Sequence, residues 1–294
     1  MGIKFRLIVM NFLQYAIWGS WLISLGAYLG GGLDFTGLQI GSFFATMGVA
    51  SLFMPAVMGI IADRWIPAQK LLGICHLVSG GFLIAAASQT AYGPLYSCML
   101  LSVMFYMPTI ALSNSVAYNA LDLARLDTVK HFPPIRVWGT VGFIAAMWFV
   151  DLTHIGGVQI KLTEWQLYVS AVLSFLLAVY SFSLPGCPVD RTVKARSWVD
   201  TLGLRAFTLF KEKRMAIFFV FSMLLGAALQ ITNAFGDSYI QSFGSMPQYA
   251  DSAIVKHSVI LLSLSQMSET FCILLIPFFL RRFGLSLIHI SEPT

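Results

Sequence analysis

The stretch GIIADRW, residues 59–65, lies between two long apolar runs. It places Gly59 ahead of an acid and a base, Asp63 and Arg64. We interpret the stretch as a loop between membrane helices, in which Gly59 lets the helices approach closely. Asp63 and Arg64 would then pair at the membrane rim and favour one gated state. The alternative is that Asp63 and Arg64 are an ordinary acid and base in a loop. The apolar stretches before and after residues 59–65 bear on this choice.

Apolar runs recur along the whole chain. The 294 residues are 57% hydrophobic and only 11% charged, with a mean hydropathy of +0.78, unlike the usage of soluble domains. Crossing about 30 Å of hydrocarbon takes roughly 20 residues. We therefore predict an all-α polytopic membrane protein with eight spans, near residues 6–30, 38–61, 70–90, 95–119, 134–151, 165–184, 214–236 and 254–280. The first run is too long for a secretory signal, and it contains Asn11 and Gln14.

The basic residues predict the orientation. Of the 18 Lys and Arg residues, fifteen lie at the N-terminus, in the loops on its side of the membrane or after the eighth span. The opposite loops contain only Lys161 and Lys256, and Arg136 lies inside a span. Because cytoplasmic loops are enriched in Lys and Arg, we expect the N-terminus and the long central loop to be cytoplasmic. The net charge of +5 is thus a topology signal, and nucleic acid is not an expected partner.

The longest polar stretch, Pro185 to Arg214, separates six spans from the last two. Its seven basic residues indicate a linker between two helical bundles. This layout resembles the major facilitator superfamily, in which two six-helix halves face each other across a midplane site. The G-x-x-x-D-R pattern of residues 59–64 also resembles the loop signature of that superfamily. The resemblance implies eight of an expected twelve helices, divided into a bundle over 1–184, a linker over 185–213 and a partial second bundle over 214–284.

Polar side chains inside the spans are the candidate site residues. A charge in the middle of the bilayer costs about 2.5–3.5 kcal/mol, and the two clear examples are Arg136 and Glu269. They have opposite signs and come from opposite halves, so they would meet across a central cavity. Snorkelling of Arg136 to the cytoplasmic rim is the alternative. We expected Pro133 and Pro134 to open the helix that carries Arg136.

Further polar groups share single helix faces with these charges. Thr140 and Phe143 follow Arg136 by four and seven residues, Gln230 and Asn233 are three apart, and so are Gln266 and Glu269. Hydrogen bonds between helices are the simpler explanation for such amides. Against it, contacts of that kind seldom need a carboxylate. One positive charge, one negative charge and several amides suit a neutral, polyhydroxylated solute that contains a ring. We expected His76 and His257 to be packing residues, with proton relay as the alternative.

Enzymatic and metal chemistry find no support in the sequence. It contains no nucleophile–base set, no phosphate-binding glycine loop and no Cys/His metal spacing, so we expected neither an enzyme nor a cofactor. Three cysteines lie within predicted spans, and Cys187 lies on the cytoplasmic side, where thiols stay reduced. We therefore expected no disulfide.

Four stretches carry a closer resemblance: FLQYAIWGSWL, HFPPIRVWGTVGFIAAMW, FKEKRMAIFFVFSMLLGAALQITNAFGD and SLSQMSETFCILLIPFFL. Together they resemble the bacterial nucleoside permeases of the nucleoside:proton symporter family. The resemblance implies import of nucleosides with protons across the inner membrane, as a monomer surrounded by lipid. It also implies substrate contacts at seven residues: Arg136, Thr140, Phe143, Gln230, Asn233, Gln266 and Glu269.

Two rival functions fit the same features. A sugar or oligosaccharide:proton symporter would keep the architecture and change the solute. A membrane scaffold without transport would use the polar pairs only to join helices. The last residues, LSLIHISEPT from Leu285 to Thr294, resemble the translation of a transposase adapter used in DNA sequencing, so we expected the family resemblance to stop at Gly284.

Overall fold

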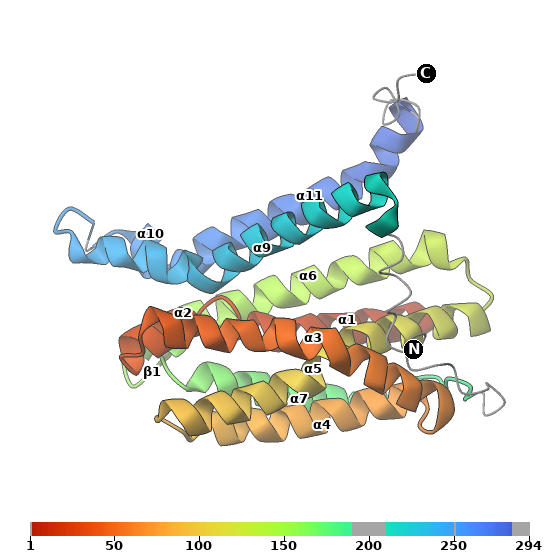
Figure 1. Ribbon diagram of the computed structural model, residues 1–294, viewed down its shortest axis with the longest axis horizontal. Coiled ribbons are helices and arrows are strands. Elements are labelled where there is room, and N and C mark those ends of the chain that lie inside the picture. The colour runs from red at the N-terminus through yellow and green to blue at the C-terminus, as the bar shows by residue number, and fades with distance from the viewer. Residues whose placement is uncertain (1, 190–209, 250, 284–294) are drawn as a thin grey trace.

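The computed structural model describes residues 2–189, 210–249 and 251–283, and nearly all of them are helical (Figure 1). The first bundle contains the long helices α1 (Ile3–Gly19), α3 (Gly37–Arg64), α4 (Ala68–Ala87), α5 (Tyr92–Leu123), α6 (Thr128–Leu152) and α7 (Trp165–Ser181). Two more long helices follow, α9 (Lys213–Ser242) and α11 (Ser258–Phe283). Each of the eight predicted spans therefore overlaps a long helix.

Membrane-spanning length is a stricter test than helix formation. Among the described residues, five helices are long and apolar enough to cross a bilayer by length and composition: α3, α4, α5, α6 and the segment Lys213–Ser245 that contains α9. Helix α7 is apolar but shorter. The prediction of a helical, membrane-type protein is thus confirmed at the level of fold class, and the number of spans stays a prediction.

The first predicted span is broken rather than continuous. Helix α1 ends at Gly19, and residues 20–24 form a turn. The chain then continues through the short helix α2 (Leu25–Ala27) and a π-helix, Tyr28–Gly32, before α3 begins with a capping box at Thr36. Three consecutive glycines, residues 30–32, end the apolar run, and glycine is a weak helix former.

Residues 59–64 belong to helix α3, so the predicted loop is wrong. The helix continues to Arg64, and Trp65 is its C-terminal capping residue. A Cβ atom added at Gly59 would meet no heavy atom within 4 Å, so this glycine makes no close helix contact among the described residues. Asp63 is exposed. The gating role of Gly59, Asp63 and Arg64 therefore loses its packing argument and stays a prediction for the acid and the base.

Helix α6 begins earlier than its prolines suggest. Its capping residue is Asp127, whose carboxylate accepts a hydrogen bond from the backbone N–H of Val129 at 2.9 Å. Pro133 and Pro134 lie inside the helix, so the expectation that they open it is wrong. Because proline has no N–H group, the carbonyl groups one turn before Pro133 and Pro134 lack a helical donor. These carbonyls lie near the exposed start of the helix, where water can bind them.

Glycines bring α1 and α6 into backbone contact. A Cβ atom at Gly142 would lie 2.1 Å from the carbonyl oxygen of Phe12, and one at Gly19 would lie 2.3 Å from that of Phe143. Only glycine permits such an approach, as is common between membrane helices. The pair α1 and α6 therefore forms a rigid wall, while α4 packs between α5 and α7 and α3 packs on α5.

A small β-hairpin lies at the end of the bundle opposite the N-terminus (Figure 1). Strands β1 (His154–Ile155) and β2 (Val158–Gln159) are antiparallel, with His154 opposite Gln159. The two residues between the strands, Gly156 and Gly157, have positive φ angles of 61° and 84°, as a tight hairpin turn requires. The 3-10 helix η2 (Ile160–Leu162) then leads into α7.

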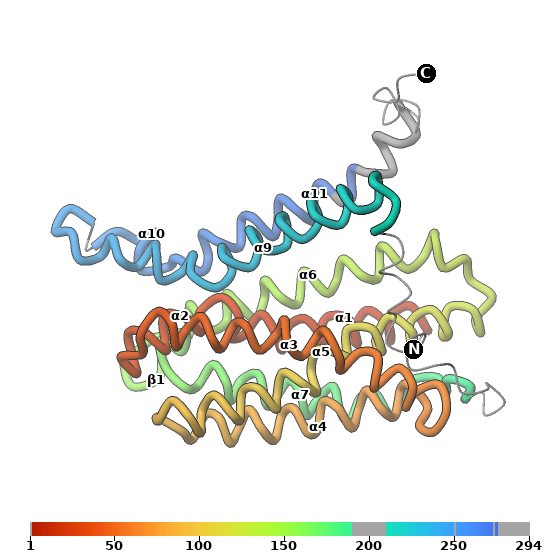
Figure 2. The backbone as a smooth tube through the Cα atoms, viewed as in Figure 1, coloured from red at the N-terminus to blue at the C-terminus, as the bar shows by residue number. Residues whose placement is uncertain are grey.

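Helices α9 and α11 form a pair outside the first bundle. They are joined by the 3-10 helix η4 (Phe243–Ser245) and by α10 (Ala253–Lys256). Helix α9 contacts α2, and α11 contacts α6. Figure 2 shows the pair closest to the first bundle near α10 and diverging from it toward the other end. This arrangement leaves a space between α1, α6 and the pair, where the candidate site lies.

Candidate functional site

One cavity collects all seven residues that the sequence predicts to bind substrate. It has a volume of about 210 Å³ and lies between four segments of the chain. Helix α6 contributes Arg136, Thr140 and Phe143, while α9 and α11 contribute pairs of polar residues one helical turn apart. The full lining is Tyr15, Trp18, Leu22, Arg136, Thr140, Phe143, Leu229, Gln230, Asn233, Gln266 and Glu269.

The guanidinium of Arg136 is held against an aromatic ring. Its Cζ atom lies 3.8 Å from the centre of the Tyr15 ring, a cation–π contact worth about 0.5–2 kcal/mol. Gly139 makes this contact possible, because a Cβ atom there would lie 2.6 Å from the Tyr15 ring and 2.8 Å from Nη1 of Arg136. The arginine therefore faces the cavity from a fixed position, and the alternative that it snorkels to the rim is not supported.

A wall of aromatic rings continues from Tyr15. Trp18 meets Phe143 edge to face, with ring centres 6.4 Å apart, and its other neighbour is Tyr106 at 6.0 Å. The Tyr106 hydroxyl donates a hydrogen bond to the backbone oxygen of Gln14 at 2.6 Å. Such edge-to-face pairs fix ring orientation, so Phe143 offers a preset face to a flat ligand.

The side chains of Gln14 and His76 behind this wall are hydrogen-bonded to neighbouring helices. The Gln14 side chain donates to Oγ1 of Thr109 at 2.7 Å, and its oxygen lies 2.8 Å from Nε2 of His76. The other ring nitrogen of His76 is 3.3 Å from Oγ of Ser174. His76 is therefore a packing residue, as predicted, and the network anchors α1 to α4, α5 and α7.

The polar side chains that face the cavity are not used in this way. Among the described residues, six of them make no side-chain hydrogen bond to another protein group: Arg136, Thr140, Gln230, Asn233, Gln266 and Glu269. Membrane-protein amides normally pair between helices, which was the simpler explanation for them. Within the described residues these side chains form no hydrogen bond between helices, so their donors and acceptors face the cavity, and the interhelical role stays an alternative.

Arg136 and Glu269 line the same cavity from opposite sides. Within the described part of the chain, no ion pair of 4.0 Å or less joins them. Both charges thus face one cavity, as expected, without forming a direct ion pair in the described residues. The separation leaves room for a solute between a cationic and an anionic group.

Four lining residues were missed by the sequence analysis: Tyr15, Trp18, Leu22 and Leu229. Tyr15 and Trp18 lie three residues apart on one face of α1, which was the available signal, whereas Leu22 lies in the turn after α1. Apolar and aromatic residues of α1 are common in any membrane helix, so only the close contact of α1 with α6 identifies this face.

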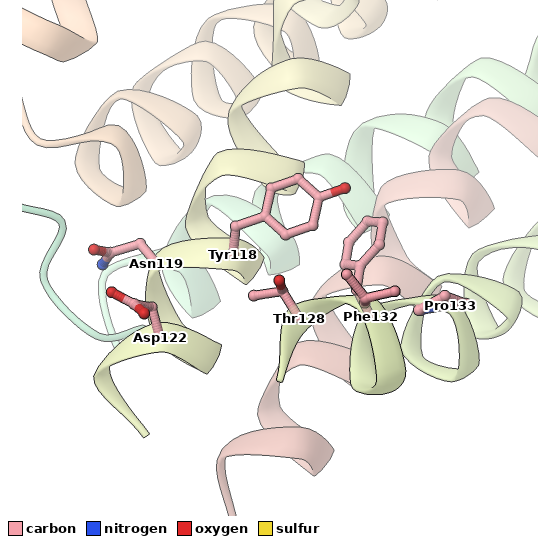
Figure 3. A pocket seen from close by; sticks show the side chains of 7 residues that line it. Tyr118, Asn119, Asp122, Thr128, Phe132 and Pro133 are labelled. Atoms are coloured by element: carbon pink, nitrogen blue, oxygen red, sulfur yellow. The ribbon is translucent and has the colours of Figure 1, made fainter. Parts of the chain in front are cut away.

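A second, larger hollow of about 640 Å³ lies at the junction of α5 and α6 (Figure 3). Tyr118, Asn119 and Asp122 border it from α5, and Thr128, Phe132 and Pro133 border it from α6. It is a shallow depression with none of the predicted site residues. The side chain of Asn119 donates a hydrogen bond to the backbone oxygen of Gly186 at 3.3 Å. We do not assign a function to this hollow.

The chain was compared with models of known protein families. The family model for nucleoside H⁺ symporters matches residues 1–291. The chain belongs to this family of symporters. The match extends past Gly284, where the resemblance was expected to stop; residues 285–294 lie outside the described residues, and their adapter origin stays a prediction.

Relatives of the nucleoside H⁺ symporter family include two permeases of Escherichia coli (strain K12). Xanthosine permease is 51% identical over 292 residues, which are 99% of this chain and 69% of that protein. Nucleoside permease NupG is 47% identical over 285 residues, which are 97% of this chain and 67% of the relative. The chain thus spans about two thirds of the length of these relatives. Because the relatives are permeases, the expectation that the chain is not an enzyme is confirmed.

Solved structures support the same family. The crystal structure of a mutant form of nucleoside transporter NupG matches with a TM-score of 0.88 at 46% identity, over 97% of this chain and 69% of that one. A second NupG crystal structure matches with a TM-score of 0.84. The fold of this symporter chain is therefore that of NupG over the part that the two share.

Proposed function

We propose that this protein imports nucleosides together with protons across the bacterial inner membrane by alternating access. Membership of the nucleoside H⁺ symporter family supports the solute class and the coupling ion. The observation that carries the proposal is the cavity whose six polar side chains form no side-chain hydrogen bond to the part of the protein that the structure describes. They come from both halves of the chain, so a solute bound to all of them joins the halves.

Each side chain has a chemical task in this proposal. Glu269 accepts hydrogen bonds from the two ribose hydroxyls, and each charge-assisted bond contributes about 1.5–3 kcal/mol. Phe143 stacks on the base, and Arg136 donates to base carbonyl oxygens. Gln230 and Asn233 form hydrogen bonds with donors and acceptors at the edge of the base. Thr140 and Gln266 offer further hydrogen-bonding groups in the same cavity.

The architecture proposed around this site has two bundles. The first covers 1–184, a basic cytoplasmic linker covers 185–213, and 214–284 supplies two helices of the second. A twelve-helix arrangement of the major facilitator type is supported by the length of the relatives and by the apolar outer face of α9. The N-terminus faces the cytoplasm, since fifteen of the 18 basic residues lie on its side or after the last span.

The test is counterflow in proteoliposomes. Vesicles loaded with unlabelled uridine should accumulate labelled uridine, and vesicles loaded with lactose should not accumulate labelled lactose. Glu269→Gln should raise the concentration for half-maximal uridine exchange by about 10- to 100-fold, because it removes at least one charge-assisted bond.

The matched control is Glu212→Gln, an exposed acid at the start of α9 outside the cavity. It should exchange uridine like the parent. Lactose exchange by the parent would support the sugar symporter instead, and no exchange of either solute would support the scaffold. Parental uridine exchange by Glu269→Gln would rule out the ribose contact.

A further inference from the structure

A buried cluster of charged residues lies at the β1 and α10 end of the molecule, away from the candidate site. Lys161 and Asp151 are almost fully buried, with Nζ 2.6 Å from Oδ1. The second carboxylate oxygen of Asp151 lies 2.6 Å from Nδ1 of His257. Nζ of Lys161 also donates to Oγ of Ser258 at 3.2 Å, and Ser258 donates in turn to the buried carboxylate of Asp237.

The cluster connects the two halves of the chain. Asp151 ends α6 and Lys161 belongs to η2, both in the first bundle. His257 and Ser258 lie where α11 begins, and Asp237 lies in α9. Two more hydrogen bonds join the halves at the backbone oxygen of Lys256, which accepts from Nζ of Lys161 at 2.9 Å and from Nε2 of Gln159 at 3.3 Å. Within α9, Nε2 of Gln241 donates to the carboxylate of Asp237 at 2.9 Å.

Its position matches the end where the helix pair lies against the first bundle. Figure 1 shows α9 and α11 closest to that bundle near α10 and β1, and farther from it toward the end that carries the N-terminus. With the proposed orientation, the cluster closes the extracellular side while the candidate cavity lies deeper along α6, α9 and α11. The cluster is therefore a contact that must break when the outer end opens.

Its formal charges do not balance. Two carboxylates, Asp151 and Asp237, face a single ammonium, that of Lys161. An uncompensated buried charge is strongly destabilising, so one more positive charge would stabilise the closed arrangement. His257 is the group that can supply it, since its side chain is 37% exposed and bonded to Asp151. Two other basic residues nearby do not face the cluster with their charged groups. Lys256 forms a surface ion pair with Asp251 at 3.0 Å, and the exposed ring of His154 is hydrogen-bonded to the backbone oxygen of Leu152.

We propose that this cluster is a proton-binding site that closes the outer end of the transporter. A proton from the extracellular water binds Nε2 of His257 and forms an N–H bond, while Nδ1–H keeps its hydrogen bond to Asp151. The cluster then has two negative and two positive charges, and the halves stay together. Opening of the outer end breaks the contact, and the proton returns to water or passes inward. The proposal deepens the proposed symport function by naming a site for the coupling ion.

The test measures the distance between the halves as a function of pH. Spin labels are placed on Val158→Cys in β2 and Tyr249→Cys between η4 and α10, both exposed, in full-length protein whose four native cysteines are replaced by alanine. Histidine changes charge between about pH 5 and pH 8. Short distances report the closed outer end. As the pH rises from about 5 to about 8, the ratio of short to long distances should fall about tenfold, because a proton that binds the closed state tenfold more tightly shifts the population by the same factor.

Two variants separate the site from general pH effects. His257→Asn keeps a donor toward Asp151 but binds no proton, so its ratio should be low and change less than about twofold. Asp237→Asn removes one negative charge, so its ratio should stay high at both ends of the range. The control His154→Asn should retain the parental tenfold change.

A full pH response in His257→Asn would overturn the proposal, and so would loss of the response in His154→Asn alone. A folded variant elutes as a single species in size-exclusion chromatography. If one of the two variants does not, the other variant still tests the proposal. The distances are measured without nucleoside, so a failure here is distinct from a failure of uridine counterflow.

Discussion

At the scale of single residues, the position of Arg136 depends on Tyr15 and Gly139. The ring supports the guanidinium at 3.8 Å, and the missing side chain of Gly139 leaves space for both groups. An arginine without such support has many rotamers and loses entropy when it binds a ligand. Tyr15 therefore prepares the cationic wall of the cavity without needing to contact the solute through its hydroxyl.

Replacing Tyr15 tests this role. Tyr15→Leu should raise the half-saturation concentration for uridine exchange by about 3- to 30-fold, because about 0.5–2 kcal/mol of cation–π contact is lost. Tyr15→Phe keeps the ring and should behave like the parent. The maximal exchange rate should change little in both variants, and the thermal midpoint should fall for Tyr15→Leu but not for Tyr15→Phe, because only the former loses the buried ring and its contact with Arg136. Equal effects of Leu and Phe on affinity would show that the hydroxyl, and not the ring, is what matters.

The candidate site also shows what the sequence reveals about single residues. Polar side chains within apolar runs are costly, so Arg136, Thr140, Gln230, Asn233, Gln266 and Glu269 were recognisable from their chemistry and spacing. Phe143 and Tyr15 were harder, because aromatic residues carry no such cost. Their place in the cavity depends on how α1 and α6 meet, which is a property of two helices.

At the scale of elements, the contact between α1 and α6 is a close approach of two backbones. Each helix presents a glycine where the backbone of the other approaches, so the contact is symmetric in kind. Sequence periodicity located both helices but not their ends. A side-chain cap at Asp127 outweighed the two prolines in α6, and a turn at residues 20–24 divided the first span. Such local competition is not visible in hydropathy.

Gly142→Ala tests that contact. The added methyl group would lie 2.1 Å from the Phe12 carbonyl oxygen, so the helices must separate. Overpacking of this kind costs about 1–3 kcal/mol, and the thermal midpoint in detergent should fall. Gly81→Ala in α4 is the control, because a Cβ atom there meets nothing within 4 Å, and its midpoint should not fall. Equal midpoints for the two variants would show that α1 and α6 adapt to the extra volume.

At the scale of the whole molecule, the sequence predicted the order of long helices and the two halves of the cavity. It did not predict the charged cluster formed by Asp151, Lys161, Asp237 and His257, whose members are up to 106 residues apart. Lys161 and His257 each lie near the end of an apolar run, where polar residues are expected. The sequence therefore assigned Lys161 only a role in topology, and it assigned His257 a packing role with proton relay as the alternative. Only the arrangement of α9 and α11 against the first bundle brings them together.

The orientation of the whole molecule gives the last prediction. The β1–β2 hairpin and the N-terminus lie at opposite ends of the first bundle (Figure 1), and the excess of Lys and Arg predicts that the N-terminal end is cytoplasmic. In intact cells, a membrane-impermeant maleimide should label Val158→Cys, which is 46% exposed, and should label Lys4→Cys only after permeabilisation. Burial raises the pKa of the native Cys187 thiol, so less of it is thiolate at neutral pH and its labelling is slow. The reverse pattern, with Lys4→Cys labelled from outside, would invert the proposed topology and place the charged cluster on the cytoplasmic side, where it would hold the inner end closed instead.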